Sequence, residues 1–449
     1  MEPARDTICA IATPPGEGGV GIVRLSGPRA LEILRRMFRT RSGRPRGAWE
    51  SHRLVLGFVL DGDERVDEVL AVYFRAPQSY TGEDVVELHG HGGPAPLKRI
   101  VDVALRAGAR TPEPGEFTLR AFMNGRMDLA QAEAVIDIIR ARTDLSLRQA
   151  MSQFSGKLST RVRALQDEIL DWMAQLEAQI DFPEDDIPAA AVAEMVVRAD
   201  AILARFDVLL AGADAGRVLR DGVRIAIVGC PNVGKSSLLN ALLGEDRAIV
   251  TDIPGTTRDS IEEWINVRGI PARIVDTAGI RASGDAIEEM GIERSRAMLA
   301  LADLALVVLD AARGVDADDE EILRISEEKP RIVVLNKCDV SDVEGRDAVR
   351  ISARTGFGID ALLETIRSRI FSGIPLDHEE VGGNLRHRDA LLRGRAHLTQ
   401  ARETAAGGLP VDFITIDLKA AVLALGEITG SSVTDQVIRR IFTQFCLGK

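Results

Sequence analysis

The 449-residue sequence has no long apolar run, because none reaches the roughly 18–20 residues that a membrane-spanning helix needs. Its first residues, MEPARDTICAIATPP, lack a charged segment followed by a longer apolar core, so a secretory signal is not expected. We therefore expect a cytoplasmic protein without membrane partners.

Cysteine is scarce and scattered. The four cysteines, Cys9, Cys230, Cys338 and Cys446, lie far apart and form no CxxC pair. This spacing argues against a metal knuckle and against a disulfide framework. A reducing compartment fits the pattern.

The chain also lacks an excess of positive charge, with 56 Lys and Arg against 68 Asp and Glu and a net charge of −12. Since phosphate binding needs clustered cations, the protein as a whole is not expected to bind nucleic acid nonspecifically. One local candidate consists of Arg386, His387, Arg388, Arg393 and Arg395. A solvated helix face is the favoured interpretation of this basic cluster, and a nucleic-acid contact is the alternative.

Three kinds of pattern divide the chain into four segments. Residues 1–119 mix short β-rich runs with Gly/Pro turns and one helical stretch near 94–107, which predicts a compact α+β domain. Residues 120–217 and 376–449 have apolar residues at helical spacing. Residues 218–375 alternate strand and helix.

The alternating segment contains the strand-like runs VRIAIVG, ARIVDTAG, LALVVLD, RIVVLNK and VRISA, with helical runs between them. This order predicts a doubly wound parallel sheet. Because helical segments flank it on both sides, the simplest architecture is one helical domain with an α/β domain inserted into it. Two separate helical bundles would give a similar pattern.

The run VRIAIVG leads into residues 229–236, GCPNVGKS, and a helical run follows. This matches the P-loop pattern GxxxxGK[ST] in its required context of strand before and helix after. Backbone N–H groups of the loop are expected to face the β-phosphate, beside the positive end of the helix. We expect Lys235 to reach the β- and γ-phosphates and Ser236 to bind Mg²⁺ through its hydroxyl.

Two further segments suit nucleotide-sensitive switches. The polar segment TDIPGTTRD begins at Thr251, and one of its threonines is expected to complete the Mg²⁺ shell when the γ-phosphate is present. The run DTAG, residues 276–279, ends a buried-looking strand. Asp276 is expected to hold Mg²⁺ through water, and the Gly279 N–H to contact the γ-phosphate.

Base choice is expected at NKCD, residues 336–339. The Asp339 carboxylate can accept hydrogen bonds from guanine N1–H and N2–H₂, a donor pair that adenine lacks, so the site should prefer GTP. Asn336 is expected to contact the other edge of the base, and the stem of Lys337 to lie over it. Ser352 and the alanine after it fit the loop that places a backbone N–H near guanine O6. The four motifs together predict a GTPase; a domain that binds GTP without hydrolysing it is the alternative.

Many small GTPases have a glutamine directly after DTAG that orients the attacking water. This chain has Ile280 there, which cannot hydrogen-bond. The segment that follows contains Arg281, Asp285, Glu288 and Glu289. Our hypothesis is that Glu288 positions the water; from the residues alone, an exposed glutamate on a helix face is an equal alternative.

Outside these motifs, the chain carries TICAIATPPGEGGVGIVRLSG near its start, then TGEDVVELHGHGG, PGEFTLRAFMNGRMDLAQAEAV and a terminal FCLGK. Together with TDIPGTTRD, these runs resemble the tRNA modification GTPase family MnmE, also called TrmE, over essentially the whole chain. The resemblance implies an N-terminal folate-binding and dimerisation domain, a discontinuous helical domain and an inserted G domain. It also implies a homodimer that forms a heterotetramer with a FAD-dependent partner of the MnmG type.

The activity implied by the resemblance is GTP hydrolysis coupled to modification of C5 of the wobble uridine of tRNA, by aminomethyl or carboxymethylaminomethyl addition. The one-carbon donor would be a tetrahydrofolate derivative, 5-formyl- or 5,10-methylene-tetrahydrofolate. The G domains would dimerise across their switch regions, with K⁺ bound. A regulatory GTPase switch in ribosome assembly is the alternative, although the acidic chain lacks the basic RNA-binding module expected there.

The resemblance also assigns residues. It favours Thr257 beside Ser236 for Mg²⁺. For K⁺, whose charge would act as an arginine finger does, it implies Asn232, Thr251, Ile253 and Thr256. For folate it implies Arg24, Glu87, Arg126 and Lys449, and Glu87 suits the N–H donors of a pterin best. The residues expected to line GTP are Asn232, Val233, Gly234, Lys235, Ser236, Ser237, Thr251, Asp252, Ile253, Pro254, Gly255, Thr256, Thr257, Asp276, Thr277, Ala278, Gly279, Asn336, Lys337, Asp339, Ser352, Ala353 and Arg354.

Two features allow more than one interpretation. His89 and His91 in HGHGG could bind a metal, but two histidines at this spacing without a ligand cluster are a weak signal. A glycine-rich turn near the folate pocket is favoured. Cys446 in FCLGK is either a packed small hydrophobe or, as the resemblance implies, a functional thiol that acts as nucleophile or acid/base group.

Overall fold

The computed structural model describes residues 6–180, 189–244, 263–275, 291–341, 347–371 and 382–449. The chain forms two compact units. One contains Met1–Ile136 with Leu425–Lys449, and the other contains Asp137–Ala424. Among the described helices, none is long and apolar enough to cross a membrane.

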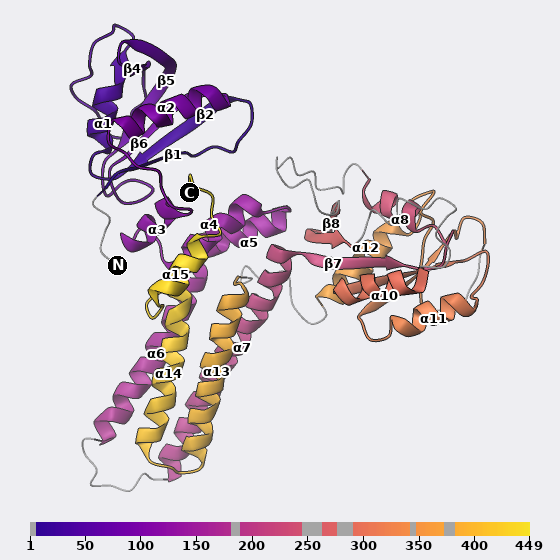
Figure 1. Ribbon diagram of the computed structural model, residues 1–449. Helices are drawn as coiled ribbons and strands as arrows, with labels where there is room; N and C mark the ends of the chain where they lie inside the picture. Colours follow the sequence, from indigo (N-terminus) through magenta and orange to yellow (C-terminus); the bar gives the residue numbers. More distant parts are fainter. Residues whose placement is uncertain (1–5, 181–188, 245–262, 276–290, 342–346, 372–381) are drawn as a thin grey trace. The chain divides into compact units, whose positions relative to one another are not determined.

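The first unit is built on a six-stranded antiparallel sheet with strand order β1-β2-β6-β5-β4-β3 (Figure 1). Its strands are β1 (Ile8–Ile11), β2 (Gly18–Ser26), β3 (Phe38–Thr40), β4 (Val55–Asp61), β5 (Glu64–Phe74) and β6 (Val85–Gly92). Helices α1 (Ala30–Met37) and α2 (Pro94–Arg106) pack on the sheet. They bury an amphipathic face, as their apolar spacing requires.

Three more helices complete this unit: α3 (Glu116–Met123), most of α4 (Leu129–Arg140) and the C-terminal α15 (Asp435–Phe442). Figure 1 shows α15 beside α3, although more than 300 residues separate them in the sequence. Phe442 joins them, since its ring lies 6.4 Å from that of Phe122 and 5.4 Å from that of Phe445. The C-terminal tail is thereby fixed to the N-terminal domain.

The second unit contains long helices that lie side by side (Figure 1). These are α5 (Asp144–Phe154), α6 (Lys157–Ile180), α7 (Ala189–Asp221), α13 (Leu385–Ala406) and most of α14 (Val411–Thr429). Helices α7 and α13 pack along each other, and Gln166 of α6 donates to the Val422 carbonyl of α14 at 3.0 Å. Segments before and after the inserted domain therefore share one helical bundle, as predicted, rather than forming two.

The inserted part contains a six-stranded sheet with order β12-β11-β10-β7-β9-β8. Its elements are β7 (Val223–Val228), α8 (Lys235–Leu242), β8 (Glu263–Val267), β9 (Ile270–Ile274), α10 (Gly291–Leu301), β10 (Leu304–Asp310), α11 (Ala317–Ile325), β11 (Arg331–Asn336), β12 (Val349–Arg350) and α12 (Ile359–Ile370). Five strands are parallel, whereas β8 pairs antiparallel with β9. The predicted doubly wound parallel sheet is therefore confirmed, and it carries an antiparallel edge strand, β8, that the sequence analysis did not select.

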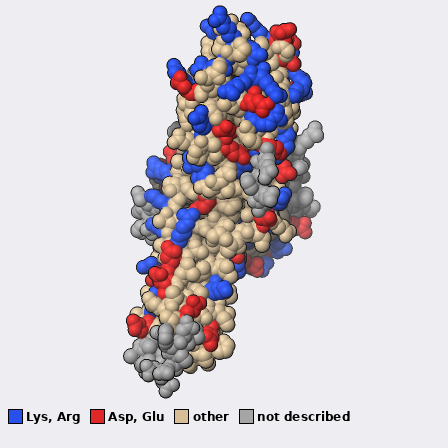
Figure 2. Space-filling view, turned by 90° about the vertical axis from the view of Figure 1, so that its left-hand side faces the viewer, with Lys and Arg blue, Asp and Glu red and all other residues tan. Residues whose placement is uncertain are grey.

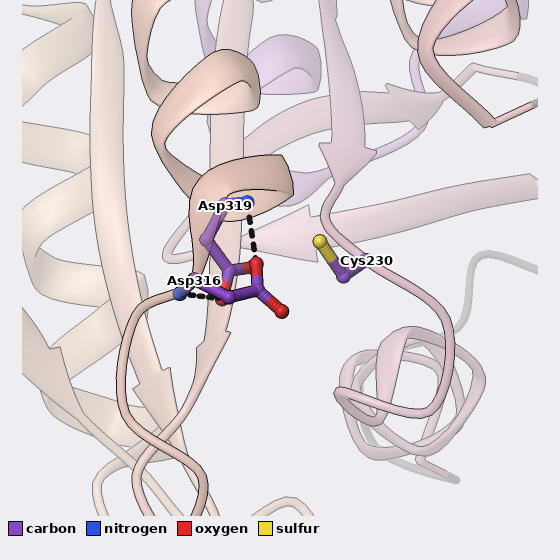
Figure 3. Close-up of side chains that lie close together, drawn as sticks. All are labelled: Cys230, Asp316 and Asp319. Atoms are coloured by element: carbon purple, nitrogen blue, oxygen red, sulfur yellow. Dashed lines mark hydrogen bonds between the residues drawn. The ribbon is translucent and has the colours of Figure 1, made fainter.

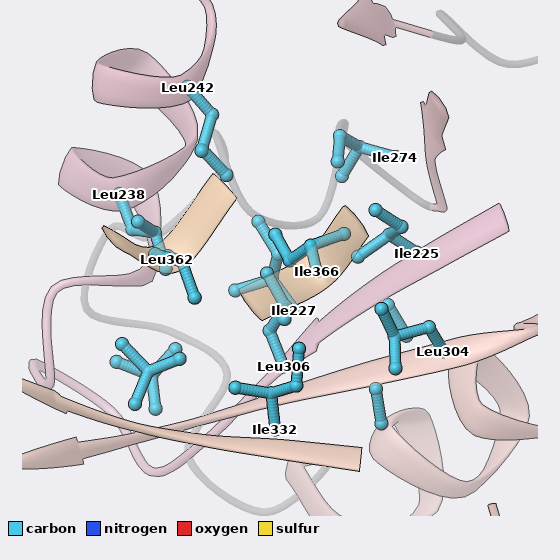
Figure 4. Close-up of a cluster of buried hydrophobic side chains, with 14 of the residues drawn as sticks. Ile225, Ile227, Leu238, Leu242, Ile274, Leu304, Leu306, Ile332, Leu362 and Ile366 are labelled. Carbon is cyan, nitrogen blue, oxygen red and sulfur yellow. The ribbon is translucent and has the colours of Figure 1, made fainter. Parts of the chain in front are cut away.

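The core of this domain follows from its continuous apolar strands. Six of the seven residues of β10 are buried, as expected for a strand covered on both faces. In Figure 4, Leu306 lies with Ile227 of β7, and Leu362 and Ile366 of α12 pack into the same cluster. This core fixes the carboxyl ends of β7 and β11, where the predicted P-loop and NKCD motifs begin.

Candidate functional site

The P-loop lies between the end of β7 and the start of α8. Gly234 has φ +96°, and a Cβ there would collide with Nδ2 of Asn336. Asn232 also has a positive φ, +60°, and is exposed. The loop thus needs glycine at position 234, where the backbone turns into the helix and approaches a second motif.

Lys235 is the first residue of α8, and its Nζ donates to the carbonyls of Gly229 and Cys230 at 2.8 and 2.7 Å. The ammonium group is therefore held inside the ring of the P-loop. Burial lowers the pKa of Lys235, which means that the charged form lacks full solvation. A phosphate oxygen in the loop would supply the missing negative partner.

Asn336 joins three of the predicted motifs. Its Nδ2 donates to the carbonyl of Val233 at 2.9 Å, and its Oδ1 accepts from the N–H of Ala353 at 3.0 Å. The side chain is almost fully buried. Sequence reasoning expected a contact with guanine and missed this role in tying the P-loop to the loop around Ser352.

Lys337 makes a second bridge. Its Nζ donates to the carbonyl of Asn232 at 2.7 Å and lies 2.6 Å from Oδ2 of Asp310. The residue has φ +66°, a conformation uncommon outside glycine. Hydrogen bonds at the end of its long side chain therefore hold it beside the P-loop.

Asp339 is oriented by two neighbours. Its Oδ1 accepts from the hydroxyl of the buried Ser352 at 2.8 Å, and its Oδ2 lies 3.2 Å from Nη2 of Arg354. The hydrogen bond from Ser352 is the main cause that lowers the pKa of Asp339, and a backbone N–H and the Arg354 charge add to it. The carboxylate is kept ionised and positioned, which is the state that a guanine base requires.

Several predicted residues lie outside the described residues. They include the segment 251–257, the run 276–279, Ile280, Arg281, Asp285, Glu288 and Glu289. Of the proposed Mg²⁺ and K⁺ ligands, Ser236 and Asn232 are described and Thr251, Ile253, Thr256 and Thr257 are not. The described residues therefore include the P-loop and the NKCD run, which are the expected contacts for the phosphates and the base.

A second polar site lies in the first unit. Arg24 of β2 and Glu87 of β6 are direct cross-strand partners, and Nε of Arg24 donates to Oε1 of Glu87 at 2.8 Å. Nε2 of His89 lies 3.1 Å from Oε2 of the same carboxylate. Nη1 of Arg24 is buried and has no hydrogen-bond partner among the described residues. A buried donor without a partner costs about 1–3 kcal/mol, so this atom suits a ligand acceptor.

The C-terminal Lys449 reaches this site. Its Nζ lies 5.8 Å from the ring centre of Tyr80, and Cζ of Arg24 lies 5.1 Å from the same ring. Burial first, and then the nearby Arg24 charge, lowers the pKa of Lys449. Two cations that share one aromatic ring create a place for an anionic or carbonyl group.

Packing of the tail explains how Lys449 arrives there. Phe445 is buried, and a Cβ on Gly448 would collide with the carbonyl of Ile11 at the end of β1. The Cys446 carbonyl accepts from the N–H groups of Gly115 and Lys449 at 3.3 and 3.1 Å. Cys446 itself is exposed. The structure thus leaves this thiol at the surface near the site, and the packed-hydrophobe interpretation is wrong for it.

Arg126 is not brought to this site by any observed contact. It is exposed in the turn after α3, and its side chain makes no hydrogen bond or ion pair within the described residues. The structure joins Arg24, Glu87 and Lys449, and it adds Tyr80, which the sequence analysis did not select. A half-buried tyrosine between two sequence-distant cations leaves no local signal in a sequence.

The histidine pair does not form a metal cluster within the described residues, since the candidate cluster found there contains neither histidine. His89 contacts Glu87, whereas Nδ1 of His91 lies 2.6 Å from Oδ1 of Asp67. The hydrogen bond to Asp67, and then the charge of that carboxylate, raise the pKa of His91. The two rings thus have different carboxylate partners.

The basic cluster on α13 is paired with acids. Arg388 lies 2.5 Å from Asp214, Arg395 lies 2.7 Å from Asp207, and Arg393 lies 3.0 Å from Asp389 on its own helix. His387 is fully buried in the capping box of α13. Figure 2 shows one face of the protein, on which acidic side chains lie among the basic ones. The cluster is therefore a helix-packing feature, and the nucleic-acid alternative loses its support.

Comparison with known proteins identifies the family. Residues 129–446 match the family model "MnmE helical domain", and residues 7–126 match "GTP-binding protein TrmE N-terminus". The chain belongs to the MnmE family of tRNA modification GTPases. The MnmE of Heliobacterium modesticaldum is 49% identical over 463 residues, covering 99% of each chain. The MnmE of Chloroflexus aurantiacus is 50% identical over 457 residues, covering 99% of this chain and 100% of its own.

Among solved structures, Aquifex aeolicus Era bound to GDP·AlF₄⁻ matches 39% of this chain and 66% of its own, with 28% identity and a TM-score of 0.25. The MnmE-family membership confirms the multidomain fold class, with N-terminal, helical and G domains, and the assignment as a GTP hydrolase. The exact domain boundaries and the site residues stay predictions.

Proposed function

We propose that this MnmE-family chain couples GTP hydrolysis to modification of C5 of the tRNA wobble uridine by aminomethyl or carboxymethylaminomethyl groups. It acts in the cytoplasm as a homodimer that forms a heterotetramer with a FAD-dependent MnmG-type partner. The family membership supports the coupling of a GTPase to tRNA modification. Two groups of residues support the proposal: the contacts among the P-loop, NKCD and Ser352 in one unit, and the contacts among Arg24, Glu87, Tyr80 and Lys449 in the other.

GTP is proposed to bind with its phosphates in the P-loop and its base at Asp339. The Lys235 ammonium exchanges carbonyl partners for phosphate oxygens, and Ser236, with Thr257, holds Mg²⁺. Asp339, held by Ser352, accepts the guanine donors. Adenine would leave this carboxylate without those partners, and such a loss costs about 1–3 kcal/mol, or roughly 5- to 150-fold in affinity.

Hydrolysis is proposed to use K⁺ and Glu288, because Ile280 cannot orient water. Asn232, Thr251, Ile253 and Thr256 would hold K⁺, which would supply positive charge beside the phosphates. The exposed Asn232 of the P-loop is consistent with this role.

The observation that carries the modification half of the proposal is the convergence of Lys449, Arg24 and Glu87 around Tyr80. A tetrahydrofolate derivative fits these groups. Glu87 matches the N–H donors of a pterin, whereas Nη1 of Arg24 and Nζ of Lys449 match its carbonyl or carboxylate oxygens. Arg126 is proposed as a more distant contact to the same ligand. Cys446, exposed beside Lys449, is the candidate thiol of the one-carbon transfer.

Ligand binding at this site tests the proposal directly. Calorimetric titration with 5-formyl-tetrahydrofolate should give one site per chain in the wild type. Lys449→Ala removes a charge-assisted hydrogen bond and should weaken binding by about 10- to 100-fold. Lys98→Ala, which changes an exposed lysine on α2 of the same unit, is the matched control and should bind as the wild type does. Equal affinity of all three proteins would reject the site.

Measurements of GTP turnover and of tRNA modification test the rest of the proposal. At saturating GTP and equal ionic strength, turnover should be at least about tenfold faster in K⁺ than in Na⁺. The purified flavoprotein partner should raise it further. Mass spectrometry of tRNA from a strain lacking the protein should show unmodified wobble uridines. Intact modification there would favour a regulatory GTPase of ribosome assembly.

A further inference from the structure

A side-chain cluster outside the nucleotide contacts joins the P-loop to helix α11. It consists of Cys230, the residue after the first P-loop glycine, with Asp316 and Asp319 at the start of α11. The Sγ of Cys230 and one carboxylate oxygen from each aspartate all lie within 4.8 Å of one another. Figure 3 shows the thiol facing the two carboxylates across the space between the P-loop and the helix.

Asp319 carries an unsatisfied atom in this cluster. The residue is fully buried, and its Oδ1 accepts no hydrogen bond from the described part of the chain. Its Oδ2 accepts from Nη2 of Arg313 at 2.9 Å and from the N–H of Asp316 at 3.4 Å. A buried carboxylate oxygen without a donor is costly, so Oδ1 lacks a partner such as Arg313 provides for Oδ2.

The charges of the cluster also favour an additional bound cation. Arg313 is the cation beside Asp316 and Asp319, at 3.1 and 2.9 Å. With a neutral thiol, one negative charge is left over. With a divalent cation and an ionised thiol, the charges of all the groups cancel. Buried charges are stable in proteins when they are paired or bind a metal.

We propose that Cys230, Asp316 and Asp319 form a binding site for a thiophilic divalent cation of the zinc class. One thiolate and two carboxylates are a ligand set that Zn²⁺ and Cd²⁺ accept, and water would complete the tetrahedron. Thiolate ligation selects against Mg²⁺, so this site is chemically distinct from the Mg²⁺ site at Ser236. Ideal Zn²⁺ geometry brings sulfur and oxygen ligands to roughly 3.5 Å, so a small inward movement of the side chains suffices.

The site is open on one side. Asp316 is exposed, and the Arg313 side chain is 43% exposed, whereas Cys230 and Asp319 are buried. A cation can therefore enter from solvent once the Arg313 head group turns away. Because Cys230 belongs to the P-loop and the aspartates to α11, the bound cation would fasten the phosphate-binding loop to the helix after β10.

Cadmium titration of the full-length protein, saturated with GDP and Mg²⁺, tests the site. A sulfur-to-cadmium charge-transfer band in the ultraviolet should rise to one equivalent per chain. Cys230→Ser should abolish that equivalent, and Asp319→Asn should weaken it at least tenfold. Cys338→Ser, which removes another thiol close to the nucleotide motifs, is the matched control and should leave the band unchanged.

Two further measurements keep the result interpretable. Circular dichroism and GDP affinity establish that each variant is folded. If Cys230→Ser does not fold, Asp316→Asn replaces it, because Asp316 is exposed and should also lower cadmium affinity at least tenfold. Equilibrium dialysis with Zn²⁺ should show the same loss. A band that persists in the folded Cys230→Ser or Asp316→Asn protein, or no binding by the wild type, overturns the proposal.

Discussion

Ser352 is the residue on which the base-recognition geometry depends most directly. Its hydroxyl donates to Asp339, and Arg354 remains as a second neighbour of the same carboxylate. Ser352→Ala should therefore weaken GDP affinity by about 1 kcal/mol, or roughly fivefold, without unfolding the domain. Titration with a fluorescent guanine nucleotide measures the change. Ser326→Ala, another fully buried serine remote from the motifs, should bind normally; equal losses in the two variants would indicate general destabilisation instead.

Glu116 should make the stability of the first unit depend on pH. Burial alone would raise the pKa of this carboxyl, but hydrogen bonds from Arg110 and Arg120 outweigh burial, and the pKa is lowered from 4.5. A lowered folded-state pKa means that this stabilisation is fully present above the unfolded-state pKa, near 4.5, and is lost as pH falls through the folded value. The expected window thus begins near pH 4.5 and extends below it.

Glu116→Gln tests this window. The substitution leaves the almost fully buried Arg120 without one ionic partner, although Asp6 and Glu83 remain close. We expect a loss on the order of 2–3 kcal/mol at pH 7 that shrinks toward acid. Hydrogen exchange of peptides from β2 and β6 reports opening of this unit. A difference that stays constant from pH 7 to pH 3 would contradict the assignment.

At the scale of single residues, sequence patterns located Lys235 and Asp339, because a motif of rare residue types specifies them. The bonds of Asn336 could not be predicted, since they join residues 233, 336 and 353, which only the folded sheet brings together. The position of Tyr80 between two cations and the unpaired Oδ1 of Asp319 could not be predicted for the same reason. Long-range polar contacts leave no periodic signal in the sequence.

Among the elements, the hairpin β8–β9 shows how the inserted domain is attached to the helical bundle. Thr143 caps α5 by accepting from the N–H of Ser146 at 3.1 Å, and its hydroxyl donates to the carbonyl of Gly269 at 2.7 Å. Leu145 packs against Gly269, and Arg142 lies 4.1 Å from the ring centre of Trp264 on β8. The turn of the β8–β9 hairpin thus contacts the N-terminus of α5.

Thr143→Val should break this anchor while nearly preserving side-chain volume. Loss of a helix cap costs about 1–2 kcal/mol, and the hydrogen bond to Gly269 is lost with it. Hydrogen exchange should therefore speed up in peptides covering α5 and the hairpin, and remain unchanged in the first unit. Thr143→Ser keeps the hydroxyl and should behave as the wild type. Protection that is equal in the Val and Ser variants would exclude the anchoring role.

Sequence patterns predicted the longer elements well. Amphipathic helices such as α2 have apolar residues at helical spacing, and buried strands such as β10 are continuous apolar runs. The sequence patterns missed β1, β3 and β8, which have four, three and five residues. Strands this short are stabilised by their partners in the sheet rather than by their own pattern. The pairing of α13 arginines with α7 aspartates could not be predicted either, because it depends on the two helices being neighbours in the fold.

For the whole molecule, the insertion of the G domain has a structural signature. Gly216 near the end of α7 and Gly383 just before α13 touch, since a Cβ on Gly216 would lie 2.6 Å from the carbonyl oxygen of Gly383. The end of α7 and the start of α13 are therefore in contact where the chain leaves the helical bundle and returns to it. Only the order of helical and α/β patterns hinted at this arrangement in the sequence.

Removing the insertion should leave two folded proteins. Joining Gly216 to Gly383 through about four glycines needs no strain, because the two backbones are already in contact. The shortened chain should keep its helical circular dichroism and its affinity for 5-formyl-tetrahydrofolate. Residues 217–382 alone should bind GDP, since their core of β7, β10, α8 and α12 lies within the segment apart from contacts with Ala215 and Leu145 of the helical bundle. As a control, a deletion that starts at residue 207 removes part of the α7–α13 packing, including the Asp207 partner of Arg395, and should aggregate. If the precise deletion aggregated as well, the G domain would be an integral part of the bundle rather than an insertion.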